Sequence, residues 1–396
     1  MLKQFLINFF LGDRLFFYMS AGRKVICAAW NQDYGCFACG FENGFRIFNT
    51  DPLKERQKVE FPDGGIGIVE MLYRCNYIAL VGGGQHPKFP PNRVVIWDDL
   101  KREAIIELDF PSPVRAVRLR RDRIVVVLNS VVRLFTFTQQ PKELHSFETI
   151  HNPRGVCALS PASSNSLLAI PSRSRVGSVD LIDLADADRA PVVIAAHNSA
   201  LRTLAFNSVG SLLATASEKG TLIRLFDTKS GVCCQEVRRG AQPANIFSIA
   251  FSADSNFFCV ASDRGTVHVF ETEQVPSEEA THESTQAVPL SPTQSSSKFR
   301  LLKDKIAGSA TAKHSFVKLP IPQTGSVCLA AFGSTSESVV VISTDGSYAR
   351  YQLNFPAKRL PNSTGNLNTW ESATVTATRD LFAHFLDVRD QEFETR

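Results

Sequence analysis

Short apolar runs separated by turn residues recur along this chain at a nearly regular interval. Each run is rich in β-branched and aromatic residues, follows a glycine or another turn residue, and is often closed by an acidic residue. The last large apolar residues of the runs are Phe48, Trp97, Phe135, Ile182, Phe226, Phe270 and Tyr351. They lie 49, 38, 47, 44, 44 and 81 residues apart, so the last interval exceeds the ordinary period of 44 by 37 residues.

A second apolar run precedes most of these runs by a few residues, as in "SLLATASEKG" and "NFFCVASDRG". Seven units of short strands at this period predict an all-β, WD40-like, seven-bladed β-propeller with four-stranded blades. Trp97 and Asp98 preserve the WD dipeptide. Strands that are buried on both faces have continuous runs of apolar residues. This explains why apolar and polar residues do not alternate strictly along these strands.

The 37 additional residues have an unusual composition and predict a long insertion, 273–314, in blade six. Its first part, Glu273 to Ser297, is rich in Ser, Thr and Pro, carries four Glu and no aromatic residue, and is therefore expected to be a mobile loop. Its second part is either a plain linker or a basic amphipathic helix that lies in a membrane interface. The residues that support the membrane interpretation are Lys298, Phe299, Arg300, Leu302, Lys303 and Ile306.

The two ends of the chain lie outside the repeat. We expect residues 1–19 to be an N-terminal extension, 20–356 to be the propeller and 357–396 to be a C-terminal tail. The run from Phe5 to Leu11 resembles a short signal sequence, but Gly12 and Asp13 interrupt it and no clean cleavage site follows. A hydrophobic strand or short helix joined to the fold is the favoured interpretation.

Composition narrows the classes of function. Lys plus Arg is 43 and Asp plus Glu is 39, and this near balance argues against a dedicated nucleic-acid binder. The nine cysteines are mostly inside apolar runs, which is typical of reduced thiols in a cytosolic protein. Cys36 and Cys39 form a CxxC, but no second pair accompanies it, so core packing is favoured over zinc. We expect no cofactor and no metal.

The sequence Arg238-Arg239-Gly240 between units five and six is a candidate anion site. Successive side chains on a strand point to opposite faces, so two adjacent arginines can reach two separate pockets. Arginine suits phosphate because its planar guanidinium forms paired, charge-assisted hydrogen bonds. The alternative is an ordinary surface pair in a turn.

Hydroxyl, histidine and cationic side chains on either side of this pair favour the phosphate interpretation. Unit five supplies His197, Ser217, Thr221 and Arg224. Unit six supplies Ser262, Arg264, Thr266 and His268. These are the groups that a phosphorylated inositol ring requires.

At these motifs the chain resembles a known family. "GTLIRLFDT", "VRRG", "ASDRGTVHVF" and "LVGGGQHPKFPPNRVVIWDDL" are similar to the PROPPINs, seven-bladed propellers that bind phosphoinositides, and most to their metazoan WIPI branch. The resemblance covers roughly residues 20–355. It implies binding of phosphatidylinositol 3-phosphate and the 3,5-bisphosphate, and a role in autophagosome formation on preautophagosomal and endosomal or lysosomal membranes.

The resemblance also implies two lipid sites. The first would use His197, Ser217, Thr221, Arg224 and Arg238. The second would use Arg239, Ser262, Arg264, Thr266 and His268. Arg264 departs from the family, where lysine is frequent. The membrane-inserting loop of the family lies in blade six, where the insertion lies here.

Two functions from different classes remain open. The leading hypothesis is a cytoplasmic, monomeric, peripheral membrane effector that recruits the autophagic bridge-like lipid-transfer protein, with Asn31 and Asp33 as tentative partner contacts. The alternative is a WD-repeat protein-interaction scaffold that does not bind lipid. No Ser/His/Asp set, carboxylate pair or metal cluster indicates catalysis, so we expect no enzyme and no nucleic-acid partner.

Overall fold

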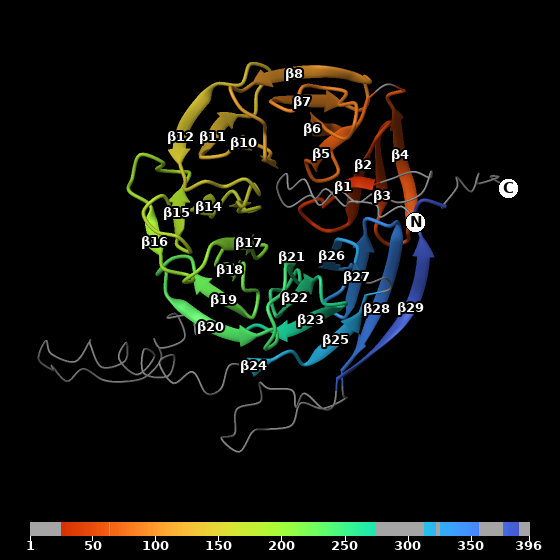
Figure 1. Cartoon of the computed structure of the whole chain (residues 1–396), viewed down its shortest axis with the longest axis vertical. Helices are drawn as coiled ribbons and strands as arrows, with labels where there is room; N and C mark the ends of the chain where they lie inside the picture. The colour runs from red at the N-terminus through yellow and green to blue at the C-terminus, as the bar shows by residue number, and fades with distance from the viewer. Residues whose placement is uncertain (1–24, 63, 274–312, 322–324, 356–374, 388–396) are drawn as a thin grey trace, which may run out of the picture.

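The computed structural model describes residues 25–62, 64–273, 313–321, 325–355 and 375–387. Within these ranges every regular element is a β-strand, and the strands form seven sheets arranged as blades around a central axis (Figure 1). The predicted seven-bladed propeller is confirmed. Across the described ranges, we find no helix with the length and apolar character needed to span a membrane.

The first four blades each consist of four consecutive antiparallel strands. Blade one contains β1 (Val25–Trp30), β2 (Cys36–Phe41), β3 (Gly44–Asn49) and β4 (Lys54–Glu60). Blade two contains β5 (Ile66–Met71), β6 (Tyr77–Gly82), β7 (Arg93–Asp98) and β8 (Glu103–Asp109). Blade three contains β9 (Ala116–Arg120), β10 (Arg123–Val127), β11 (Val131–Thr136) and β12 (Glu143–Glu148). Blade four contains β13 (Ala158–Leu159), β14 (Leu167–Pro171), β15 (Val179–Asp183) and β16 (Val192–Ile194).

In the last three blades, one short strand of the blade-six insertion is added to the sheet of blade five. Blade five contains β17 (Leu201–Phe206), β18 (Leu212–Ser217), β19 (Leu222–Asp227), β20 (Cys233–Arg238) and the added β24 (Lys313–His314). Blade six contains β21 (Ile246–Phe251), β22 (Phe257–Ser262), β23 (Thr266–Glu271) and β25 (Val317–Pro320). Blade seven contains β26 (Cys328–Phe332), β27 (Ser338–Ser343), β28 (Ser347–Asn354) and β29 (Thr376–His384).

The predicted insertion separates the third and fourth strands of blade six. Most of it, 274–312, lies outside the described residues, as do all six residues proposed for its membrane-inserting part. Its last residues form β24, which pairs in parallel with β20 of blade five before the chain returns to blade six as β25. The insertion therefore joins the outer edges of two neighbouring blades.

The predicted C-terminal boundary of the propeller was too early. Residues 376–384, which we assigned to a tail, form β29 and pair with β28 as the outermost strand of blade seven. No residue of this strand is fully buried, and its one apolar run, Leu381-Phe382-Ala383, is short. Because an outer strand buries little of its surface, the apolar periodicity that revealed the other strands is absent here.

The hydrophobic core lies between neighbouring blades. The middle strands β18, β22 and β27 are buried at every position, as expected for sheets packed on both faces. Cys36 and Cys39 of the CxxC are both buried in β2, yet they pack into different clusters, one facing blade two and the other blade seven. Burial raises the pKa of both thiols. The two sulfurs therefore serve the packing of two separate blade interfaces.

The ring closes between blades seven and one through side chains. Each of these two sheets is built from its own consecutive strands, with no exchange between them among the described residues. Phe385, which follows β29, is fully buried and packs with its ring centroid 5.2 Å from that of Phe37 and 5.1 Å from that of Phe48. The Tyr348 hydroxyl donates to the Thr50 carbonyl at 2.9 Å. Aromatic packing thus stabilises a closure that strand pairing does not provide.

Candidate functional site

Two successive blades carry the same short hairpin at the same place. Ser217 ends β18 and Thr221 immediately precedes β19, while Ser262 ends β22 and Thr266 begins β23. The intervening sequences, Glu-Lys-Gly and Asp-Arg-Gly, place a cation and a glycine in each turn. Gly220 has φ +59°, and a Cβ there would lie 2.0 Å from the Ala244 carbonyl oxygen, so a larger residue would not fit.

The arginine pair lies at the end of β20, beside the first hairpin. Arg238 is the last residue of that strand and pairs with Leu222 of β19. The Arg239 backbone N–H donates to the Thr221 carbonyl at 2.9 Å. Adjacent strand positions face opposite sides, so the two guanidinium groups leave the strand in different directions.

The two arginines differ in their surroundings. Arg239 is only 6% exposed; its Nε donates to the Gly220 carbonyl at 2.8 Å and its Nη2 donates to the Gln242 carbonyl. Burial, followed by the charge of Arg264, lowers its pKa. Arg238 is half-buried, and its guanidinium makes no hydrogen bond or ion pair with another residue in the described part of the chain. Arg239 is therefore not the surface residue that either sequence interpretation of the pair would require, whereas Arg238 keeps access to solvent.

The first set of predicted residues meets at the boundary of blades four and five. His197 Nε2 lies 2.9 Å from Thr215 Oγ1, and its backbone N–H donates to the Gly177 carbonyl of blade four. Arg224 is ion-paired with Glu236 at 2.7 Å and also donates to the Ala196 carbonyl. Burial, followed by the charge of Arg224, lowers the pKa of His197 to about 4. Arg224 is thus held by protein groups, which leaves Arg238 as the more available cation of this set.

The second set meets at the boundary of blades five and six. His268 Nδ1 lies 3.0 Å from Ser315 Oγ, and its Nε2 lies 3.3 Å from Thr266 Oγ1. Burial, followed by the charges of Lys318 and Arg239, lowers the pKa of His268 to about 4. The exposed Arg264 donates its Nε to the Pro243 carbonyl at 2.9 Å. Both ring nitrogens of His268 therefore contact hydroxyl groups of the protein itself.

The structure identifies two further cations that the sequence interpretation missed. Lys219 is exposed and occupies, in "SEKGT", the position that Arg264 occupies in "SDRGT". Lys318 of β25 pairs with His268 across the sheet. Aligning the two hairpins against each other would have found Lys219. Lys318 could not be found in this way, because the insertion separates β23 from β25 and hides their pairing.

The two histidines are not equivalent members of the repeat. His197 lies in the segment that enters β17, whereas His268 lies within β23. The repeat therefore extends to the Ser, Thr and cationic positions of the hairpins but not to the imidazoles. Each of the two blade edges therefore carries cationic side chains and hydroxyl donors. Arg238 and Arg239 lie between these edges.

Asn31 and Asp33, the two residues expected from the sequence to contact a protein partner, differ in their exposure to solvent. Asn31 is 1% exposed; its Nδ2 donates to the Tyr73 carbonyl at 3.2 Å and its Oδ1 accepts from the Cys36 N–H at 3.0 Å. Asp33 lies on the surface, paired with Arg74 at 3.4 Å. The Asn31 side chain therefore holds a turn together and is not available to a partner, whereas Asp33 is.

Comparison with known proteins identifies a group of similar sequences. A family model described as PROPPIN matches residues 24–292. SVP1-like protein 2 of Pichia angusta is 44% identical over 278 residues, which cover 68% of this chain and 77% of that protein. Autophagy-related protein 18e of Arabidopsis thaliana is 34% identical over 331 residues, which cover 83% of each. These relatives are fungal and plant proteins, so they do not single out a metazoan branch.

Solved structures of other proteins have the same propeller fold as this chain. Kluyveromyces lactis Hsv2 aligns with a TM-score of 0.70 at 24% identity, covering 92% of this chain and all of that one. KlAtg21, solved in complex with the coiled coil of AgAtg16, aligns with a TM-score of 0.64 at 23% identity, covering 83% of this chain and 94% of that one. At these identities the similarity establishes the fold.

Proposed function

Because this chain belongs to the PROPPIN family, whose members are non-enzymatic phosphoinositide-binding propellers, we propose that it reads 3-phosphorylated phosphoinositides on autophagic membranes. Its ligands would be phosphatidylinositol 3-phosphate and phosphatidylinositol 3,5-bisphosphate. One headgroup would occupy the Arg238 side of the arginine pair and a second the Arg239 side. The protein would act at preautophagosomal and endosomal or lysosomal membranes. Its assignment to the metazoan WIPI branch stays a prediction.

The observation that carries this proposal is the repeated hairpin beside the arginine pair. Each hairpin combines a Ser, a Thr and a turn cation, Lys219 in blade five and Arg264 in blade six. A phosphate accepts hydrogen bonds from hydroxyl and guanidinium groups, and charge-assisted bonds are about twice as strong as neutral ones. Two such sites on one rigid edge would bind one membrane together, so their affinities reinforce each other.

Liposome flotation tests the proposal against the scaffold alternative. We expect the protein to float with liposomes that contain either 3-phosphorylated lipid and not with liposomes of phosphatidylcholine alone. Changing Arg238 or Arg264 to Ala should weaken flotation partially, because each change removes one of two sites. The double change should nearly abolish it. Equal flotation with and without the 3-phosphate would favour the scaffold.

We also propose that the face of blade one carries a protein partner, the autophagic bridge-like lipid-transfer protein. The exposed Asp33 and Arg74 pair supports this position, and KlAtg21 was solved with a protein partner, the coiled coil of AgAtg16. Changing Asp33 and Arg74 together to Ala should reduce pull-down of the partner while lipid flotation persists. Asp188, exposed on blade four, supplies the matched control when changed to Ala. Unchanged pull-down would move the partner site elsewhere.

A further inference from the structure

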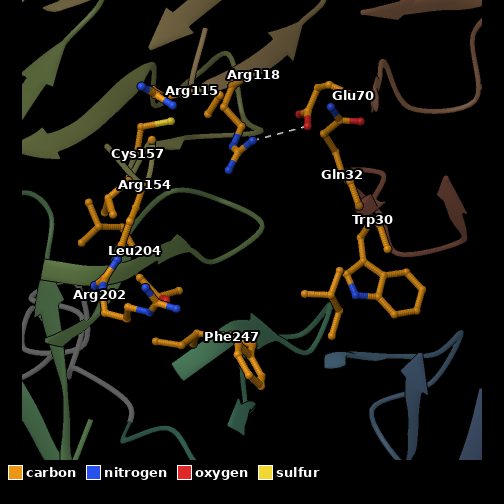
Figure 2. A pocket seen from close by; sticks show the side chains of 18 of the residues that line it. Trp30, Gln32, Glu70, Arg115, Arg118, Arg154, Cys157, Arg202, Leu204 and Phe247 are labelled. Atoms are coloured by element: carbon orange, nitrogen blue, oxygen red, sulfur yellow. Dashed lines mark hydrogen bonds and ion pairs between the residues drawn. The ribbon is translucent and has the colours of Figure 1, made fainter. Parts of the chain in front are cut away.

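A cavity of about 320 Å³ lies among the innermost strands of the ring (Figure 2). The innermost strands of six blades line it, namely β1, β5, β9, β17, β21 and β26, and the segment leading into β13 completes the wall. None of the residues assigned to the two lipid sites is part of this lining. The cavity is therefore a separate feature of the fold.

The cavity is strongly cationic. Its lining contains the four arginines Arg115, Arg118, Arg154 and Arg202. Figure 2 shows Arg115, Arg154 and Arg202 along one side of it, opposite Trp30 and Gln32, with Arg118 reaching toward Glu70. Glu70 is the sole acidic residue of the lining.

Arg118 and Arg154 contact carboxylates, whereas Arg115 contacts a neutral amide. Arg118 Nη1 lies 3.5 Å from Glu70 Oε2, and Arg154 Nη1 lies 2.7 Å from Oε1 of Glu218, which is outside the lining. Arg115 donates its Nε to the neutral Asn129 amide oxygen at 2.7 Å, which orients the guanidinium without neutralising it.

Arg118 and Arg154 keep access to solvent, whereas Arg202 is only 4% exposed. Gln32, on the opposite side, donates to the Met71 and Leu119 carbonyls, and these bonds tie together the inner strands of blades two and three, from which Glu70 and Arg118 project. The side chains of Arg118 and Arg154 keep 35% and 26% of their exposure. Gathering like charges in a partly desolvated space is unfavourable unless an anion enters it.

We propose that this central cavity binds a small anion that carries several phosphate groups. Guanidinium groups from three blades can each form paired hydrogen bonds to a different phosphate, which a singly charged anion could not satisfy. The volume lies at the lower end of the range for small-molecule sites, so the ligand is compact. Because the site is at the ring centre, its ligand is soluble and is not a headgroup attached to a bilayer.

Calorimetric titration of the full chain with tripolyphosphate tests this site. The titration uses the Arg238→Ala, Arg264→Ala double variant, so that the lipid sites contribute little. We expect one saturable site per chain. Changing Arg115 to Gln in this background should weaken binding at least about tenfold, as for the loss of a charge-assisted hydrogen bond. Arg115→Lys should bind with intermediate affinity, because lysine keeps the charge without the planar fork.

The controls distinguish binding in the cavity from binding elsewhere on the protein surface. Arg56 is exposed on the outer strand of blade one, and Arg56→Gln removes the same charge and should leave tripolyphosphate binding unchanged. Arg115→Gln in the otherwise unaltered chain should leave flotation with phosphatidylinositol 3-phosphate liposomes unchanged. The proposal is overturned if no variant binds tripolyphosphate, if Arg115→Gln binds as tightly as its parent, or if an oligoglutamate peptide of equal charge binds as tightly as tripolyphosphate.

Discussion

Arg238 and Arg239 are neighbours in sequence but have different structural roles. The Arg239 guanidinium bridges the carbonyls of Gly220 and Gln242, one from the blade-five hairpin and the other from the segment that leads into blade six. Arg238 makes no such bond to the part of the chain that the structure describes. One arginine therefore contributes to the joint between two blades, and the other is free to meet a ligand.

We expect Arg239→Ala to destabilise the propeller and Arg238→Ala to leave its stability unchanged. Removing Arg239 leaves two carbonyls without their charged donor, a loss of about 1.5–3 kcal/mol in the free energy of unfolding. Urea denaturation followed by tryptophan fluorescence measures this difference, and Arg264→Ala, which removes an exposed guanidinium, serves as the control. Equal midpoints for the Arg238 and Arg239 variants would contradict the structural role.

The two buried histidines make stability depend on pH. Burial lowers the pKa values of His197 and His268 to about 4, from the ordinary value of 6.5. Between these values the unfolded chain binds more protons than the folded one, so stability rises with pH through this window and is fully present above pH 6.5. We expect the urea midpoint to fall when the pH is lowered from 7.5 to 5.

Substituting each histidine tests whether it causes the dependence of stability on pH. His197→Gln and His268→Gln should each show a smaller fall in midpoint between pH 7.5 and 5 than the unaltered chain, because glutamine does not titrate. His151, which is exposed on the segment between blades three and four, supplies the control substitution to Gln. An unchanged fall in both variants would assign the pH dependence to other groups.

The residue types of the site could be predicted from sequence, but their accessibility could not. Ser217, Thr221, Ser262 and Thr266 are visible as paired motifs because they recur at the same spacing. Whether Arg239 or Asn31 faces solvent depends on the carbonyls that other blades present to it, such as that of Tyr73. Such contacts are long-range, and no local pattern encodes them.

At the level of elements, the insertion is attached at both ends. Glu273, its first residue, forms an ion pair with Lys313 of β24 at 2.8 Å. β24 itself pairs with β20, so that His314 lies beside Arg238 in the sheet. Both attachment points of the insertion therefore lie at the edge of blade five, next to the first proposed lipid site.

We expect the insertion to strengthen membrane binding without determining lipid preference. Changing Phe299, Leu302 and Ile306 together to Ser should weaken liposome binding, since each side chain contributes up to about 1.5–3 kcal/mol if fully buried in the bilayer. Headgroup preference should persist, because the hairpins would provide it. Flotation with and without phosphatidylinositol 3-phosphate measures both properties. Unchanged affinity would make the segment a linker, and lost preference would make it the lipid reader.

The sequence predicts inner strands better than outer ones. The inner and middle strands bury both faces and therefore appear as apolar runs with a period near 44 residues. β29 has no fully buried residue and only a three-residue apolar run, and β24 has only two residues, so neither shows this pattern clearly. The positions of β24 and β29 are determined by pairing with β20 and β28, and such pairing cannot be recognised from the local sequence.

At the level of the whole molecule, the closure between blades seven and one concentrates stability in a few aromatic rings. We expect Phe385→Ala to lower the free energy of unfolding by about 3–5 kcal/mol, because it leaves a cavity beside the stacked rings of Phe37 and Phe48. Phe382→Ala is the matched control, since that ring lies in β29, three residues before Phe385, and is 51% exposed. Thermal unfolding measures both, and equal melting temperatures would show that the closure depends on other contacts.

The strand order of blade six has a consequence for the time course of synthesis. Six blades complete a four-stranded sheet from strands that follow one another along the chain, so each can pair its strands as they emerge. In blade six, β23 ends at Glu271 and its partner β25 begins at Val317. Until that partner emerges, β23 is an unpaired edge, a feature that promotes association between chains. Among the strands of the described four-stranded sheets, β23 thus waits longest during synthesis for its partner, since β28 of blade seven waits only from Asn354 to Thr376.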